Sequence, residues 1–127
     1  MVTLILLSHS RKIVEGIAEL AAEMAAGTPV VPVGGSAAGT LGSDFDRTHA
    51  AFETAAAQGE VVVLADLGSA KMTGEMAREA LSPELQERIF LSDAAIVEGG
   101  LAAAVSIAGG SNARDTLDSL KEYLLDK

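Results

Sequence analysis

Three short apolar segments constrain the fold of this chain most, because each has the length of a strand and none alternates with polar residues. They are Val2–Leu7, Pro29–Val33 and Val61–Ala65, and Arg88–Leu91 is a weaker fourth candidate. Branched side chains in unbroken runs are typical of parallel strands covered on both faces. Pro29 and Pro32 place the second segment toward a sheet edge, because proline cannot donate to the hydrogen-bond ladder.

The segment after the first strand predicts an amphipathic helix that starts beyond Ser10. Its apolar positions recur at spacings of four and three, which places Ile13, Ile17, Leu20 and Met24 on one helix face. Gly27 is a plausible end for this helix, since glycine is common just past a helix terminus.

Three further segments also have helical patterns: Asp44–Gln58, Lys71–Leu81 and Ser111–Leu125. Ser43 stands three residues before Asp46 as a variant of the capping box, and Phe45 and Phe52 are available to the core. Met72 and Met76 follow each other at helical spacing in the second segment, and Ser82-Pro83 breaks it. Glu98–Val105 is less clear and fits either an alanine-rich helix or part of a subunit interface, because its small side chains permit close backbone approach.

Alternating strands and helices predict an α/β fold, a three-layer α/β/α sandwich around a mainly parallel sheet. We expect the strand order 2-1-3-4, with a fifth edge element left open. The length fits one domain spanning residues 1–127. Because the chain is 49% hydrophobic but only 3% aromatic, the core must be built from aliphatic side chains.

Charge and composition exclude several classes of function. A net charge of -9 argues against nucleic-acid binding, which needs a clustered cationic surface. The chain has no cysteine, so a disulfide framework, a thiolate metal site and a thiol nucleophile are excluded. The apolar start is too short to span a membrane and lacks the pattern of a signal peptide. We therefore expect a cytoplasmic protein without membrane or nucleic-acid partners.

The candidate site follows from the rule that open α/β sheets bind ligands beyond the carboxyl ends of their strands. Polar or glycine-rich segments follow all three strands there, and they suit a bound anion. The candidate phosphate contacts are Ser8, Ser10, Gly35, Ser36, Thr40, Gly68 and Ser69. Among these, Thr40 and Ser69 are the stronger candidates, and caps or turns are the alternative roles of the hydroxyl residues.

His9 is the candidate catalytic residue, as the acceptor of a phosphoryl group. Such a group would lie at the N-terminus of the first helix, where free N–H groups and the helix dipole favour negative charge. To attack phosphorus, one ring nitrogen must be unprotonated while an acceptor holds the proton on the other. Asp66, at the end of the neighbouring strand, is the predicted acceptor. The alternatives are a helix-cap histidine and an Asp that caps the next turn.

The remaining polar residues have weaker functional interpretations. Arg11, Lys12 and Lys71 could contact a phosphorylated partner or simply be solvated surface charges. His49 lies within a predicted helix as a bystander, and two histidines alone make a poor metal site, so we predict no metal. A serine hydrolase lacks the G-x-S-x-G elbow, and a receiver-type regulator lacks the paired carboxylates that bind Mg²⁺.

Four sequence strings resemble one known family. They are Leu7-Ser8-His9-Ser10, Gly34-Gly35 with Gly42-Ser43-Asp44-Phe45-Asp46, Asp66-Leu67-Gly68-Ser69-Ala70-Lys71-Met72 and Val97-Glu98-Gly99. Together they are similar to the phosphotransfer subunit of the phosphoenolpyruvate-dependent dihydroxyacetone kinase. The enzyme IIA domains of the mannose class share the expected fold and histidine, but not the string that begins at Asp66.

The resemblance implies a homodimeric phosphocarrier. His9 would receive a phosphoryl group from the phosphocarrier protein HPr and pass it to ADP held on the nucleotide-binding subunit of the kinase. No cofactor would be bound permanently, and the covalent phosphoryl group on His9 would be an intermediate. The rival function is a mannose-class enzyme IIA that passes phosphate to a sugar-transporting enzyme IIB.

Overall fold

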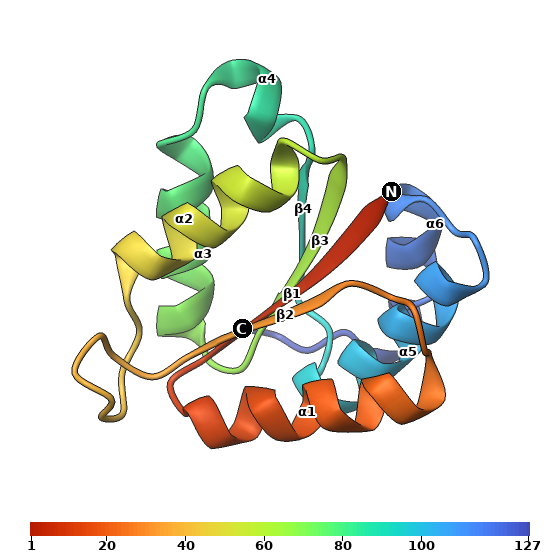
Figure 1. Cartoon of the computed structure of the whole chain (residues 1–127), viewed down its shortest axis with the longest axis horizontal. Helices are drawn as coiled ribbons and strands as arrows, with labels where there is room; N and C mark the ends of the chain where they lie inside the picture. Colours follow the sequence, from red (N-terminus) through yellow and green to blue (C-terminus); the bar gives the residue numbers. More distant parts are fainter.

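Four parallel strands form one sheet in the computed structural model, which describes all 127 residues (Figure 1). The strands are β1 Val2–Ser8, β2 Val30–Gly34, β3 Glu60–Ala65 and β4 Ile89–Ser92. Their order is β2-β1-β3-β4, so the predicted order is confirmed. Leu4 of β1 lies opposite Val30 on one side and Val62 on the other. Because every strand runs in the same direction, all four carboxyl ends meet at one edge of the sheet.

Helices cover both faces of the sheet, which confirms the three-layer α/β/α fold. They are α1 Arg11–Met24, α2 Phe45–Ala56, α3 Gly68–Glu79, α4 Pro83–Gln86, α5 Ile96–Ala108 and α6 Ala113–Asp118, followed by the 3-10 helix η1 Lys121–Tyr123. In Figure 1, α2, α3 and α4 lie on one side of the strands, and α1, α5 and α6 lie on the other. Of the two interpretations left open for Glu98–Val105, the helical one is confirmed, because the segment lies within helix α5.

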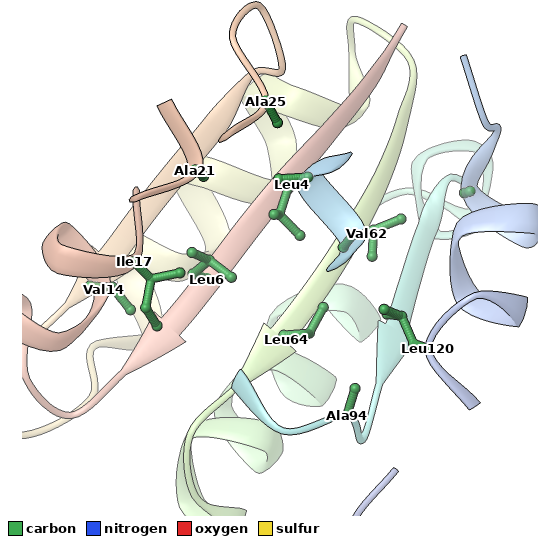
Figure 2. Close-up of a cluster of buried hydrophobic side chains, with 13 residues drawn as sticks. Leu4, Leu6, Val14, Ile17, Ala21, Ala25, Val62, Leu64, Ala94 and Leu120 are labelled. Carbon is green, nitrogen blue, oxygen red and sulfur yellow. The ribbon is translucent and has the colours of Figure 1, made fainter. Parts of the chain in front are cut away.

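Two hydrophobic cores of 13 buried residues each separate the sheet from its helix layers. Leu4 and Leu6 of β1 belong to the core under α1 and α5, which Figure 2 shows. Ile5 and Leu7 belong to the core under α2 and α3. The unbroken apolar sequence of β1 follows from this arrangement, because alternate side chains of a strand point to opposite faces and both faces are covered.

The apolar face predicted for α1 is only partly in the core. Ile17 is buried, but Ile13, Leu20 and Met24 are 45%, 48% and 58% exposed. The buried stripe of the helix is instead Val14, Ile17 and Ala21. Ile17 belongs to both stripes, so spacing alone could not distinguish them. The stripe with the smaller side chains is the one that packs onto the sheet.

Helix α2 begins with a different cap from the one predicted. Asp44, and not Ser43, is the N-cap, and its Oδ1 accepts a hydrogen bond from the backbone N–H of Arg47 at 3.0 Å. Phe52 is fully buried as expected. Phe45 is 38% exposed and stacks on His49 at a centroid distance of 5.8 Å, so it is not one of the buried core residues.

Helix α3 begins at Gly68, three residues before the predicted start at Lys71. Met72 and Met76 are 61% and 57% exposed, so they are not core residues. The buried positions are Ala70, Gly74 and Ala77. A Cβ at Gly74 would lie 3.1 Å from Leu7 Cδ1, so the helix packs too closely on the sheet for a methionine at this face.

The C-terminal segment contains fewer helical residues than predicted. Instead of one helix over residues 111–125, it forms α6 and η1, and Leu120 is fully buried while Leu124 is 54% exposed. In place of the possible fifth edge element, the structure has only an isolated antiparallel bridge between Ala94 and Leu124.

None of the helices has both the length and the apolar character needed to cross a bilayer.

Gly99 offers a test of the close packing of α5. A Cβ built there would meet Ala94 Cβ at 2.8 Å and Leu64 Cδ2 at 3.0 Å, so Gly99→Ala overpacks the core. We expect the free energy of unfolding to fall by about 1–2 kcal/mol, measured by urea denaturation. The matched control is Gly16→Ala in the exposed face of α1, where nothing lies within 4 Å. It should raise stability by about 0.5–1 kcal/mol through helix propensity, and equal stability of the two variants would contradict this packing.

Candidate functional site

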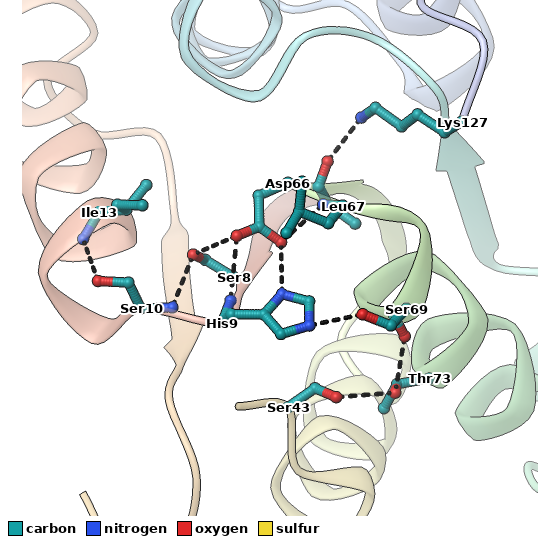
Figure 3. A network of polar contacts seen from close by, with 11 residues as sticks. Ser8, His9, Ser10, Ile13, Ser43, Asp66, Leu67, Ser69, Thr73 and Lys127 are labelled. Atoms are coloured by element: carbon teal, nitrogen blue, oxygen red, sulfur yellow. Dashed lines mark hydrogen bonds and ion pairs between the residues drawn. The ribbon is translucent and has the colours of Figure 1, made fainter. Parts of the chain in front are cut away.

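The candidate site lies where β1 and β3 end side by side. Leu7 of β1 pairs with Ala65 of β3, so the next residues of both strands, Ser8 and Asp66, enter the same edge of the sheet. His9 follows Ser8 directly. Figure 3 shows the imidazole between the Asp66 carboxylate and Ser69, which comes from the first turn of α3. The structure therefore brings together three residues that are up to 60 positions apart in the sequence.

The two ring nitrogens of His9 have different partners. Nδ1 lies 3.1 Å from Asp66 Oδ1, and Nε2 lies 2.6 Å from Ser69 Oγ. A carboxylate can only accept hydrogen bonds, so the neutral ring carries its proton on Nδ1 and Nε2 accepts from the Ser69 hydroxyl. The side chain of His9 is 25% exposed. The unprotonated nitrogen is thus next to a hydroxyl in a ring that solvent can reach.

Asp66 is fixed by a set of donors on both carboxylate oxygens. Oδ2 accepts from Ser8 Oγ at 2.8 Å and from the His9 backbone N–H at 3.1 Å. Oδ1 also accepts from the Leu67 backbone N–H at 2.7 Å. Partial burial acts to raise the pKa of Asp66, but the hydrogen bonds from Ser8, His9 and Leu67 together lower it below its ordinary value. Asp66 therefore stays ionised and keeps its accepting role.

The lowered pKa of Asp66 predicts a pH dependence of stability. A carboxyl group with a lowered pKa in the folded state stabilises the fold above its ordinary pKa, and this contribution is lost as pH falls through the lowered value. The difference in unfolding free energy between wild type and Asp66→Asn should therefore shrink below about pH 4. Denaturant unfolding at a series of pH values measures it. A difference that stays constant or grows on acidification would contradict the prediction.

The ring points toward a different helix end from the one predicted. We expected an anion on His9 at the N-terminus of α1, but Nε2 faces Ser69 at the start of α3. The N-terminus of α1 is capped by Ser10, whose Oγ accepts from the Ile13 backbone N–H. The N-cap of α3, Leu67, has no side-chain cap. The free N–H groups that favour an anion near Nε2 therefore belong to α3, including those of Gly68 and Ser69.

Ser8 and Ser10 have structural partners in this arrangement. Ser8 is 3% exposed, donates to Asp66 and accepts from the Ser10 backbone N–H at 2.9 Å. Ser10 Oγ caps α1. Both were predicted to contact phosphate, and the structure gives both residues local roles that position Asp66 and the first helix.

Gly35, Ser36 and Thr40 lie in the loop after β2 and make no hydrogen bond to the ring. Ser36 Oγ lies 2.8 Å from Thr40 Oγ1, and Gly35 has a φ of +74°, a value that glycine adopts readily. The loop is tied to the site through backbone bonds from Gly35 N–H to Ser8 O and from Gly42 N–H to His9 O. It lines a separate pocket together with Arg11 and Lys12.

The third predicted contact cation, Lys71, is held within the molecule. Its Nζ lies 3.1 Å from Asp93 Oδ1 and donates to the backbone oxygen of Lys127 at 3.3 Å. The Lys71 side chain is 27% exposed. Arg11, by contrast, is 65% exposed and lies 3.7 Å from Glu15. A role for these cations in partner contact stays a prediction.

Sequence patterns missed two cations near the site. Lys127, which lies near Asp66 in Figure 3, donates through Nζ to the backbone oxygens of Ala65 and Ala94 at 2.6 and 2.7 Å. These bonds tie Lys127 to the end of β3 and to the segment after β4. Burial lowers the pKa of Lys127, while the carboxylates of Asp93 and Asp66 act against this shift. Arg47 Nη1 donates to the backbone oxygens of Gly34 and Gly35, each at 3.1 Å. No local pattern marks either contact, because both join distant parts of the chain.

The backbone of Ser69 also accepts a hydrogen bond from a side chain of the next helical turn. Thr73 Oγ1 donates to the backbone oxygen of Ser69 at 3.0 Å and lies 3.2 Å from Ser43 Oγ (Figure 3).

His49, stacked on Phe45, is not part of this network. Nowhere in the chain do three or more His, Asp or Glu side chains gather in a way that could hold a metal ion.

Comparisons with known proteins identify the family of this chain. A family model described as "PTS system fructose IIA component" matches residues 3–117. The phosphoryl donor subunit DhaM of PEP-dependent dihydroxyacetone kinase 2 from Listeria innocua is 36% identical, over 83% of this chain and 85% of that protein. The DhaM subunit from Escherichia coli is 37% identical over 88% of this chain. This chain spans only 25% of the length of the Escherichia coli protein.

Two crystal structures share the fold. EF1359, a protein of unknown function, matches with a TM-score of 0.88 at 31% identity, covering 98% of this chain and 96% of that one. The phosphotransferase system component EIIA from Streptococcus agalactiae matches with a TM-score of 0.68 at 21% identity, covering 99% and 97%. The second likeness is one of fold alone. From the family match and the relatives together, the chain belongs to the mannose-class EIIA family of the phosphotransferase system and, within it, to the DhaM type.

Proposed function

We propose that the chain is a phosphocarrier that accepts a phosphoryl group on Nε2 of His9 and passes it on within a dihydroxyacetone kinase system. The observation that carries this proposal is the asymmetric ring. Nδ1 is held by Asp66 at 3.1 Å, while Nε2 accepts a hydrogen bond from Ser69 beside the uncapped start of α3. A nucleophile held by an acceptor on one side and open to an anion site on the other suits phosphoryl transfer.

The acceptance step follows from these contacts. The lone pair of Nε2 attacks phosphorus in a phosphohistidine of the donor, and the P–N bond to the donor ring breaks with its electron pair returning to that ring. His9 then carries a positive charge shared over the imidazole, which Asp66 stabilises through Nδ1–H. Ser69 Oγ, released from Nε2, can donate to a phosphoryl oxygen, as can the N–H groups at the start of α3.

The proposed donor is the phosphocarrier protein HPr, and the proposed acceptor is ADP on the nucleotide-binding subunit of the kinase. The names of the relatives support this direction of transfer, since DhaM proteins are described as phosphoryl donor subunits. No permanently bound cofactor is required, because the phosphoryl group on His9 is itself the intermediate. We place the reaction in the cytoplasm, together with its proposed partners.

The second candidate is a mannose-class enzyme IIA that passes phosphate to a sugar-transporting enzyme IIB. The description of the matching family model favours it, since that description names a IIA component of the phosphotransferase system. Both candidates use His9 in the same way and differ only in the acceptor. The relatives of DhaM type, at up to 37% identity, make the kinase subunit the preferred acceptor.

The deciding experiment offers the phosphorylated protein to each acceptor. Phosphoprotein prepared with enzyme I, HPr and phosphoenolpyruvate is mixed with either the ADP-loaded kinase subunit or an enzyme IIB, and loss of the phosphoryl group is followed by intact mass. Rapid loss to the ADP-loaded subunit alone is expected. Loss only to the enzyme IIB would replace the first candidate by the second.

We also propose a homodimer in which α1 and α5 form the contact. Exposed apolar side chains on these adjacent helices support this proposal: Ile13, Leu20 and Met24 on α1, and Val97 and Val105 on α5. Met24 and Val105 line one shallow depression between the helices. Burying such a patch is favourable at about 25 cal/mol per Å² of apolar surface. Sedimentation equilibrium tests the proposal, and a monomer at all accessible concentrations would reject it.

A further inference from the structure

A pocket of about 550 Å³ opens one residue beyond His9, between the start of α1 and the loop after β2. Its walls include Ser10, which follows His9, and Gly35, whose backbone N–H is bonded to Ser8 O. His9 itself does not line this pocket, and its Nε2 faces α3. The pocket is therefore a feature separate from the site where the phosphoryl group of His9 is proposed to lie.

The charge of this pocket is opposite to that of the molecule. The chain has 18 acidic and 9 basic residues, yet Arg11, Lys12 and Arg47 all line the pocket and no Asp or Glu does. The one carboxylate paired with these cations is Glu15, which lies 3.7 Å from Arg11 Nε and is itself 57% exposed. Such a pair at the surface neutralises little of the local charge.

The start of α1 adds to the positive potential. The first turn of this 14-residue helix holds no acidic residue and instead begins with Arg11 and Lys12. Cations at the positive end of a helix dipole are unfavourable unless an anion lies nearby. Gly35 lies beside this first turn, since a Cβ built there would come within 3.8 Å of both Arg11 Cβ and the Arg11 backbone nitrogen. Three positive side chains and the positive end of a helix thus surround one cavity. This arrangement is unfavourable for the free chain, because charges of the same sign lie close together.

The pocket holds hydrogen-bond donors that can still serve a ligand. Arg47 is anchored through Nη1 to the backbone oxygens of Gly34 and Gly35, which leaves Nε and Nη2 without a protein partner. Ser36 Oγ and Thr40 Oγ1 share one hydrogen bond, so whichever hydroxyl accepts in it keeps its own proton for a ligand. Only two of the 11 lining residues are hydrophobic and none is aromatic, so the walls offer no surface on which a base could stack. The donors suit phosphate oxygens.

We propose that this pocket binds a phosphate group of the acceptor nucleotide when a nucleotide-loaded partner docks beside His9. This inference rests on the proposed function, because it assigns the pocket to the acceptor step of the phosphocarrier. A multiply charged phosphate is favoured over a carboxylate side chain, since three cations and a helix end converge on a cavity larger than one carboxylate fills. The pocket gives the carrier a means to recognise a loaded partner.

The first test uses inorganic pyrophosphate as the probe and needs no partner. Titration is followed by the amide NMR signals of the full chain at low salt. The signals of Gly35, Ser36 and Thr40 should shift, and the double variant Arg11→Gln/Lys12→Gln should bind about tenfold more weakly. Lys121→Gln, which changes a 75% exposed cation paired with Asp118, is the matched control and should bind like wild type. Unchanged loop signals, or equal binding by the double variant, would overturn the proposal.

The second test identifies the source of the anion. The affinity of the double variant for the kinase subunit is compared with and without bound ADP. The loss of affinity should be at least about fivefold larger for the ADP-loaded subunit. Equal losses would mean that the pocket contacts acidic side chains of the partner, and the nucleotide assignment would fail. If wild-type His9 is not phosphorylated at all, the proposed function fails, while the pyrophosphate titration still decides whether the pocket binds phosphate.

Discussion

The variant His9→Ala is expected to accept no phosphoryl group from phosphorylated HPr while keeping the wild-type fold. The imidazole supplies the nucleophile, and Ser69, the nearest hydroxyl at 2.6 Å from Nε2, has no base of its own once the ring is gone. Intact mass after incubation with enzyme I, HPr and phosphoenolpyruvate measures acceptance. Circular dichroism and urea unfolding measure the fold, and the cost in stability should be about 1 kcal/mol because the ring is partly exposed.

The matched control for this variant is His49→Ala. His49 lies on α2 and stacks on Phe45, outside the network that holds His9. Its removal should leave phosphoryl acceptance at the wild-type level. Phosphorylation of His9→Ala at the wild-type rate would show that another residue carries the phosphoryl group, and an unfolded His9→Ala would call for the more conservative His9→Gln.

The second large effect is expected for Asp66→Asn. All four hydrogen bonds to the Asp66 carboxylate come from donors, two on each oxygen. An asparagine must place its NH₂ group against one of these pairs. If the NH₂ group takes the Oδ1 position, His9 Nδ1 must lose its proton and Nε2 must carry it. Nε2 is then no longer a nucleophile, so the rate of acceptance should fall by about 10²- to 10⁴-fold.

Two measurements distinguish this mechanism from a general loss of structure. The ¹⁵N chemical shifts of His9 should report a shift of the neutral ring toward the Nε2–H tautomer in Asp66→Asn. Asp118→Asn, a surface change on α6 that breaks only the pair with Lys121, should keep both the tautomer and the rate. If Asp66→Asn transfers phosphate as fast as wild type, the carboxylate has no part in preparing the ring.

The sequence was sufficient to predict the sheet and the contact between His9 and Asp66. Unbroken branched runs such as Val61–Ala65 indicate strands covered on both faces, and the strand-end rule then selects the neighbourhoods of His9 and Asp66. That rule works because parallel strands in register place their carboxyl ends at one edge, as Leu7 and Ala65 do. Nearness of these residues is thus a consequence of topology.

Three features could not be predicted, because they depend on how closely a helix approaches the sheet or on contacts between distant parts of the chain. In α1 two apolar stripes share Ile17, and only the approach of the sheet decides that Ala21 is buried and Leu20 is exposed. The direction of the His9 ring, toward α3 and not α1, depends on Asp66 holding Nδ1. The anchoring of the Gly34–Ser36 loop by Arg47 has no sequence pattern, because backbone oxygens of any residue could accept the same bonds.

The central claim is that Nε2 of His9 carries the phosphoryl group while Nδ1 keeps its proton against Asp66. Heteronuclear NMR of ¹⁵N-histidine-labelled protein, phosphorylated through HPr, tests it most directly through ³¹P–¹⁵N coupling. The account predicts coupling of phosphorus to Nε2 of His9 and a protonated Nδ1. Coupling to Nδ1, or a phosphoryl group on any residue other than His9, would contradict it.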